Sequence, residues 1–237
     1  MKSLGVLFDY NGTLVDDEHL HQKAFQEVLQ AYNIDLTDEL YNRACLGKTD
    51  TDCFTSLAGE CDGQLSGVPT NNLLELKGDR YRKLAAGADI LFPNTRQFIR
   101  RLSQDCRLAI VTGARRQEVL ALLSSESLTP FFDFVVAAED IARGKPHPEG
   151  YRKGLQRMGL SEKRVVVIED SPSGIAAAKA AGLACIAVLH TCRKEDLREA
   201  NVIVERISDI TVTTIRRVIS RHTRELPVTL QKYREGE

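Results

Sequence analysis

Six short apolar runs, separated by stretches with helical spacing, limit most strongly what this chain can fold into. The runs are rich in β-branched residues and read LGVLF (4–8), RLAIV (107–111), FVVAA (134–138), VVVIE (165–169), ACIAVL (184–189) and VIV (202–204). Strands that are apolar at nearly every position, and that alternate with helices, are typical of a parallel sheet covered on both faces. The pattern therefore predicts an α/β protein with a Rossmann-like, doubly wound sheet.

One long segment interrupts this alternation. Between residues 8 and 107 no run resembles a strand, whereas Leu20, Ala24 and Val28 recur at helical spacing. We therefore expect a catalytic core of residues 1–15 and 89–237 and an inserted helical cap of residues 16–88. At the other end of the chain an apolar stripe predicts a final helix, after which the chain frays.

The composition disfavours several kinds of partner. Lys and Arg number 32 against 33 Asp and Glu, a formal net charge of -1, which gives no field that favours nucleic acid or an anionic membrane. No apolar run approaches the roughly 20 residues that span a bilayer. We expect a small-molecule partner, no nucleic acid, no membrane, and a monomer or a small homo-oligomer.

The six cysteines are scattered, and no secretory leader precedes the first apolar run. This usage favours reduced thiols in a cytoplasmic protein. Cys53 and Cys61 can in principle form a bridge or share a metal, but small buried side chains are the favoured interpretation.

Reactive side chains follow four of the predicted strands. Asp9 ends the first, Thr112 the second, Lys145 lies beyond the third, and Glu169 with Asp170 ends the fourth. The carboxyl ends of parallel strands share one edge of a sheet, so these side chains are expected to converge. An aspartate can attack phosphorus, Mg²⁺ takes carboxylate oxygens, and a lysine with a hydroxyl stabilises the developing charge. Each residue alone is as often a turn or capping residue, but the combination favours phosphoryl transfer.

The same stretches carry a family resemblance that covers nearly the whole chain. The first motif of the haloacid dehalogenase-like superfamily is similar to FDYNGTLVD (8–16), and its second to IVTG (110–113). RGKPHPEGY (143–151) resembles its lysine motif, and VVVIEDSPSGIAAAKAAGL (165–183) its acidic metal-binding motif. Within the superfamily, the chain is most similar to the β-phosphoglucomutase and phosphoglycolate phosphatase branch, whose cap follows the first strand and whose cap loop is similar to LGKTDTD (46–52).

The resemblance implies roles for individual residues. Asp9 is the nucleophile, and Thr112 and Lys145 hold the phosphoryl group. Mg²⁺ is bound by Asp9, the main-chain carbonyl of Asn11 and Asp170, with Glu169 beside them. The implied substrate-binding residues are Gly12, Thr13, Gly113, His21, Lys48 and Thr49.

Asn11 departs from the family pattern, which has a second aspartate there as general acid and base. An amide does not titrate in this range, so it can replace neither role. Positioned acid–base catalysis contributes about 10²–10⁴ in rate. We therefore expect a site that binds Mg²⁺ and phosphate but is slow on alkyl phosphates and faster on aryl or acyl phosphates. The nearby residues 16–19 and His21 either supply a replacement acid or begin the first cap helix, whose dipole favours acids.

The favoured function is Mg²⁺-dependent hydrolysis of a small phosphorylated metabolite through Asp9, with a phosphomutase second. A phosphate-binding pseudophosphatase without turnover is the non-enzyme alternative. A phosphonoacetaldehyde hydrolase, with Lys48 as its Schiff-base amine, is less favoured because the cap loop also resembles that of the phosphatases. A metal-free dehalogenase is disfavoured because it has no need of Glu169 and Asp170.

Overall fold

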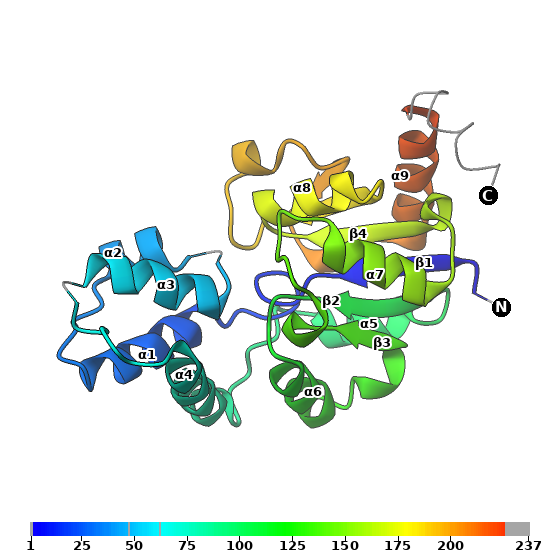
Figure 1. The fold of residues 1–237 in the computed structure, drawn as a ribbon. Coiled ribbons are helices and arrows are strands. Elements are labelled where there is room, and N and C mark those ends of the chain that lie inside the picture. Colours follow the sequence, from blue (N-terminus) through cyan, green and yellow to red (C-terminus); the bar gives the residue numbers. More distant parts are fainter. Residues whose placement is uncertain (1, 47, 62, 226–237) are drawn as a thin grey trace. The chain divides into compact units, whose positions relative to one another are not determined.

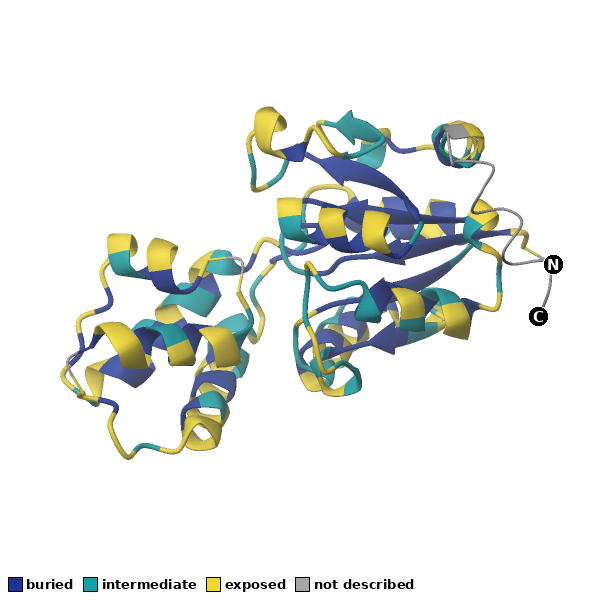
Figure 2. Cartoon of the chain, turned by 45° about the horizontal axis from the view of Figure 1, so that its top comes forward, coloured by how far each residue is buried: buried dark blue, intermediate teal, exposed yellow. Residues whose placement is uncertain are grey.

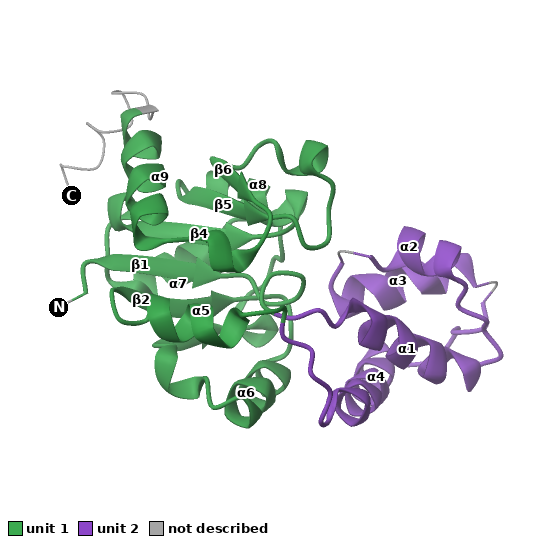
Figure 3. Ribbon diagram, turned by 180° about the vertical axis from the view of Figure 1, so that it is seen from behind, with its two compact units in different colours: residues 1–14, 92–237 green, residues 15–91 purple. Residues whose placement is uncertain are grey.

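The computed structural model describes residues 2–46, 48–61 and 63–225. By its internal contacts the chain divides into two compact units, Met1–Leu14 with Phe92–Glu237, and Val15–Leu91 (Figure 3). The second unit is an insertion into the first, and it begins at Val15, shortly after the first strand and the loop that follows it. Each unit is built around its own apolar cluster.

The first unit contains a parallel sheet, whose strands in the described residues lie in the order β3-β2-β1-β4-β5-β6 (Figure 1). Its strands are β1 (Leu4–Phe8), β2 (Cys106–Val111), β3 (Phe134–Val136), β4 (Val165–Glu169), β5 (Ala184–Val188) and β6 (Val202–Val204). β1 pairs with β2 from Leu4↔Cys106 to Phe8↔Ile110, and with β4 from Gly5↔Val165 to Phe8↔Ile168. Whatever follows β1 therefore emerges between the ends of β2 and β4.

Helices cover both faces of this sheet, which is why the strands are apolar throughout (Figure 2). One face packs on α7 (Glu149–Met158) and α8 (Pro172–Ala180), and β4 and β5 also contact α9 (Val212–Glu225). Leu7 belongs to the cluster beside α7 and α8, whereas the ring of Phe8 meets the ring of Phe98 edge to face, with centroids 6.1 Å apart. The remaining helices of this unit are α5 (Thr95–Leu102) and α6 (Arg116–Ser125).

The final helix predicted from the apolar stripe is α9, in which Ile215, Val218 and Ile219 are buried. The expected fraying falls on residues 226–237, outside the described residues. Within the described part of the chain, no helix combines the length and apolar character that crossing a membrane requires.

The second unit is helical in its described residues. Its helices are α1 (Glu18–Gln30), α2 (Asp38–Ala44), α3 (Asp50–Glu60) and α4 (Thr70–Ala85). Thr37 and Thr49 cap α2 and α3, each accepting a hydrogen bond from the backbone N–H three residues on. The buried residues of α4 include Leu73, Lys77 and Tyr81, spaced four apart on one face. The core of this unit therefore contains a fully buried lysine.

Candidate functional site

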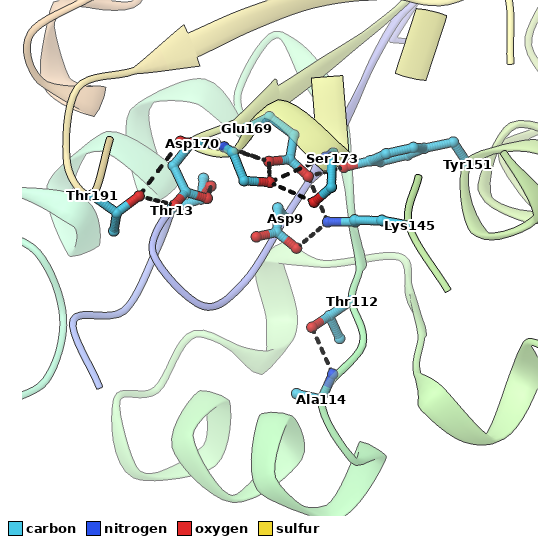
Figure 4. A network of polar contacts seen from close by, with 12 residues as sticks. Asp9, Thr13, Thr112, Ala114, Lys145, Tyr151, Glu169, Asp170, Ser173 and Thr191 are labelled. Carbon is cyan, nitrogen blue, oxygen red and sulfur yellow. Dashed lines mark hydrogen bonds and ion pairs between the residues drawn. The ribbon is translucent and has the colours of Figure 1, made fainter. Parts of the chain in front are cut away.

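The carboxyl edge of the sheet gathers a buried acidic cluster (Figure 4). Asp9 follows β1, and its N–H donates a 2.9 Å hydrogen bond to the carbonyl of Ile168 on β4, which fixes its backbone between the two strands. Glu169 is the last residue of β4, and Asp170 follows it. All three carboxylates are buried.

Lys145 provides the positive charge of the cluster. Its Nζ donates to Oδ1 of Asp9 and, at 2.5 Å, to Oε1 of Glu169. Burial opposes the charged form, but the two carboxylates dominate and raise the pKa of Lys145 above its ordinary value. The ammonium therefore stays charged and holds Asp9 and Glu169 together.

Both oxygens of Glu169 are engaged. Oε1 also accepts a 2.8 Å hydrogen bond from the Tyr151 hydroxyl. Oε2 accepts from the N–H groups of Asp170 and Ser171 at 2.9 and 3.0 Å, and from the Ser171 hydroxyl at 3.0 Å. Burial raises the pKa of Glu169, but Lys145 and these donors outweigh it and the pKa is lowered. Glu169 is thus an anion that anchors Lys145 and the start of α8.

Asp170 lies against the loop that follows β1. Its Oδ1 accepts a 2.9 Å hydrogen bond from the Thr13 hydroxyl, and its Oδ2 accepts one from Thr191. Gly12, at φ +76°, passes so close that a Cβ there would lie 2.2 Å from Asp170 Oδ2, so any side chain at this position would be strained and would have to displace that carboxylate. Burial and the neighbouring Glu169 raise the pKa of Asp170 to about 6.

The cluster fits a hard divalent cation. Asp9, Glu169 and Asp170 each offer an oxygen, and these atoms all lie within 4.8 Å of one another. Oxygen ligands around Mg²⁺ lie about 3–4 Å from one another, a spacing comparable to that of these atoms. Burial, Glu169 and Asp170 raise the pKa of Asp9, against the opposing effect of Lys145. The three carboxylates are metal ligands of the right kind, and one ammonium does not balance their negative charge. A divalent cation would neutralise the charge that remains.

Thr112 stands at the end of β2, on the same edge of the sheet. Its N–H donates to the carbonyl of Val136 and its hydroxyl accepts from the N–H of Ala114, both at 2.9 Å. Gly113 follows and is exposed. Asn11 lies half-buried between Asp9 and Gly12 in the turn after β1. The edge thus carries an accessible backbone segment beside the acidic cluster.

Three of the predicted substrate-binding residues belong to the second unit. Lys48 Nζ donates to the Ser56 hydroxyl at 3.0 Å, and Thr49 bonds Asp52 at the start of α3. His21 belongs to a largely buried hydrogen-bonded network with contact distances of 2.5–3.2 Å. Its members are Asp17, His21, Asp50, Lys77 and Tyr81.

Lys77 is the centre of this network. It is fully buried, and its Nζ lies 2.8 Å from both carboxylate oxygens of Asp50 and 2.5 Å from His21 Nδ1. The rings of His21 and Tyr81 are stacked with centroids 4.2 Å apart. The Asp17 carboxylate accepts hydrogen bonds from both His21 and Tyr81. Asp17 therefore has two places in the second unit: it precedes α1, and it is a member of this network.

Sequence reasoning missed several residues of these clusters. Tyr151 ends the quoted lysine motif, but its contact with Glu169 depends on how α7 packs. Thr191 follows β5, and the rule that found Asp9 and Thr112 at strand ends would also have found it. Arg116, four residues beyond Thr112, donates to Asp140 and to the carbonyl of Val135.

Residues 6–188 match the protein family described as haloacid dehalogenase-like hydrolase. The chain belongs to this family. A curated relative, the phosphorylated carbohydrates phosphatase of Thermotoga maritima, is 30% identical over 194 residues, which cover 78% of this chain and 85% of the relative.

Two solved structures of the family are similar over most of the chain. CbbY from Rhodobacter sphaeroides in complex with phosphate has a TM-score of 0.79 at 28% identity, covering 88% of this chain and 96% of CbbY. A β-phosphoglucomutase from Clostridium difficile has a TM-score of 0.81 at 19% identity, covering 94% and 99%, a likeness of fold alone. The chain is a hydrolase of the phosphatase and phosphomutase type within the haloacid dehalogenase-like family.

Proposed function

We propose that this chain is a Mg²⁺-dependent phosphohydrolase that acts on a small phosphorylated sugar through an aspartyl-phosphate at Asp9. The observation that carries the proposal is the contact of one lysine, Lys145, with both Asp9 and Glu169, in a cluster that also holds Asp170. A buried carboxylate backed by a cation and aimed out of a strand end is suited to nucleophilic attack.

In the proposed reaction an oxygen of Asp9 attacks the phosphorus atom and the bond to the leaving oxygen breaks. Water then attacks the aspartyl-phosphate, which releases phosphate and restores Asp9. Burial raises the pKa of Asp9, and Lys145 opposes that effect and so favours the ionised, attacking form of the carboxylate. Asp9, Asp170 and the main-chain carbonyl of Asn11 would hold Mg²⁺, with Glu169 beside them. When bound, the ion would neutralise charge on the phosphoryl oxygens.

The phosphoryl group would be received by donors on two loops. The Thr112 hydroxyl and the Gly113 N–H lie after β2, and the N–H groups of Gly12 and Thr13 lie after β1. Backbone N–H groups and hydroxyls at fixed positions stabilise charge that develops on transferring oxygens. Lys145 completes this set from the side of Glu169.

Asn11 sets the expected limits of the reaction. Because its amide cannot exchange a proton, the leaving oxygen departs without assistance and the attacking water is not deprotonated by this residue. Acyl and aryl phosphates, whose leaving groups are weak bases, would therefore react faster than alkyl phosphates. The phosphatase of phosphorylated carbohydrates among the relatives supports a sugar phosphate as the physiological substrate class.

The test is phosphate release from acetyl phosphate and para-nitrophenyl phosphate with Mg²⁺. Asp9→Asn, which keeps the shape of the nucleophile, is expected to abolish turnover, and Asn11→Asp is expected to raise it by about 10² or more. If the parent chain and both variants are equally inert although Mg²⁺ and phosphate bind, the phosphate-binding pseudophosphatase takes the place of the enzyme.

A further inference from the structure

Two consecutive residues outside the four sequence motifs contact two of those motifs. His190 and Thr191 follow β5, at the same edge of the sheet as Asp9. His190 Nδ1 lies 3.3 Å from the carbonyl of Gly12, and its ring lies against that of Phe92 with centroids 3.9 Å apart. The Thr191 hydroxyl donates to Oδ2 of Asp170 (Figure 4). The segment after β5 therefore meets both the loop after β1 and the acid after β4.

Asp170 is consequently held from two directions. Thr13, from the loop after β1, donates to Oδ1, and Thr191, from the segment after β5, donates to Oδ2. Together the two hydroxyls fix the plane of the carboxylate, because each of its oxygens has a partner on a different element. A carboxylate oxygen has a second lone pair, so both oxygens remain able to bind a cation.

The packing around Thr191 shows how tightly this arrangement is defined. A Cβ placed on Gly12 would lie 2.2 Å from Asp170 Oδ2 and 3.0 Å from Thr191 Cγ2. The backbone at Gly12, the Asp170 carboxylate and the Thr191 side chain are therefore in mutual contact. Thr191 itself is exposed, so its hydroxyl contributes little to burial of the core.

Resting on the function proposed above, we propose that Thr191 is a positioning residue for the metal site, and that its hydroxyl holds Asp170 in the orientation that ligates Mg²⁺. Residues that hydrogen-bond a metal ligand orient it, and their loss costs about 10- to 100-fold in metal affinity. The hydrogen bond from Thr13 to Oδ1 alone would leave the Asp170 carboxylate free to pivot about that oxygen. Thr191 removes that freedom before the ion arrives.

The experiment is calorimetric titration of the metal-free full chain with MgCl₂, which reports binding without any turnover. Thr191→Val keeps the shape of the side chain and removes only the hydroxyl. It is expected to weaken Mg²⁺ binding by about 10-fold or more, whereas Thr191→Ser restores the affinity to within about threefold. Thr213→Val, which makes the same change at an exposed position of α9, is the matched control and leaves the affinity unchanged.

Thermal unfolding in EDTA separates positioning from a merely structural role. If Thr191→Val lowers the unfolding temperature of the metal-free chain and Thr191→Ser leaves it unchanged, the hydroxyl of Thr191 has a structural role and the inference is overturned. Mg²⁺ binding by Thr191→Val equal to that of the parent overturns the inference alone and leaves the proposed function standing. A parent chain that binds no Mg²⁺ overturns the metal-dependent function, and the inference with it.

Discussion

Gly174 faces the carboxylate of Glu169 so closely that a Cβ on Gly174 would lie 1.6 Å from Glu169 Oε1. The first turn of α8 thus packs against a buried carboxylate. The other oxygen of that carboxylate, Oε2, accepts hydrogen bonds from the N–H groups of Asp170 and Ser171, which precede the helix. Negative charge at a helix N-terminus is favourable, and here the helix start also excludes any side chain larger than hydrogen. The position of Glu169, and through it Lys145, depends on this contact.

Gly174→Ala is expected to destabilise the fold by about 1–3 kcal/mol, since the new methyl group must displace Glu169 or the start of α8. Urea unfolding of both proteins measures the loss. Gly59→Ala, in the last turn of α3, is the control, because a Cβ there meets nothing within 4 Å and the substitution is expected to be neutral or stabilising. Equal stability of Gly174→Ala and the parent would contradict the close contact.

The dependence of rate on the leaving group tests the role of Asn11. Across a series of phosphate esters, the parent rate is expected to fall steeply as the pKa of the leaving alcohol rises, because no residue at position 11 protonates it. Asn11→Asp is expected to flatten the slope and to gain most, about 10²–10⁴, on alkyl phosphates. Steady-state rates give the slopes, and parallel slopes would show that another group supplies the proton.

Mg²⁺ affinity is expected to decrease as the pH is lowered. Burial and Glu169 raise the pKa of Asp170 to about 6, and burial foremost raises that of Asp9, so protons compete with the ion. A raised folded-state pKa means that, without metal, the contribution of Asp170 to stability is present at low pH and is lost as pH rises through about 6. Calorimetry at pH 5 and 7.5 should show tighter binding at pH 7.5, and an affinity independent of pH would contradict it.

Lys77→Met is expected to destabilise the second unit by about 3–5 kcal/mol, because it leaves Asp50 without its buried cation. Lys77→Met with Asp50→Leu removes both charges and should lie closer to the parent. Hydrogen exchange in α1 and α4, followed by mass spectrometry, reports the local free energy of opening. Lys23→Met, at an exposed position of α1, controls for loss of a positive charge. A double variant no better than Lys77→Met would mean that packing, not charge, dominates.

The strands of the sheet could be predicted from the sequence because each one is marked by a short run of neighbouring apolar residues. Runs apolar at nearly every position mark strands covered on both faces, and each of the six predicted runs coincides largely with an observed strand. β2 begins one residue earlier, at Cys106, and β3 ends at Val136 rather than 138. There Ala138 already begins a 3₁₀ turn. The four acidic and basic site residues followed from one geometric rule, that the carboxyl ends of parallel strands share an edge.

Contacts that depend on helix packing were beyond that rule. Tyr151 reaches Glu169 only because α7 lies against β1 and β2, and no spacing in the sequence indicates which face its ring takes. Lys77 shares the helical stripe of Leu73 and Tyr81, so its burial was readable from periodicity. Its partner Asp50 was not, because two residues on separate helices meet only through tertiary packing.

The ends of the insertion lie side by side. Val15 and Leu91 form an antiparallel bridge, and the N–H of Phe92 donates a 3.1 Å hydrogen bond to the carbonyl of Leu14. The inserted segment therefore leaves and rejoins the first unit at two neighbouring backbone positions, as the loop of a β-hairpin does, and this holds whatever its length. Inserted segments of different size can therefore be exchanged between these two positions while β1 and α5 keep their register, so the insertion can change without any change to the acidic cluster of Asp9, Glu169 and Asp170.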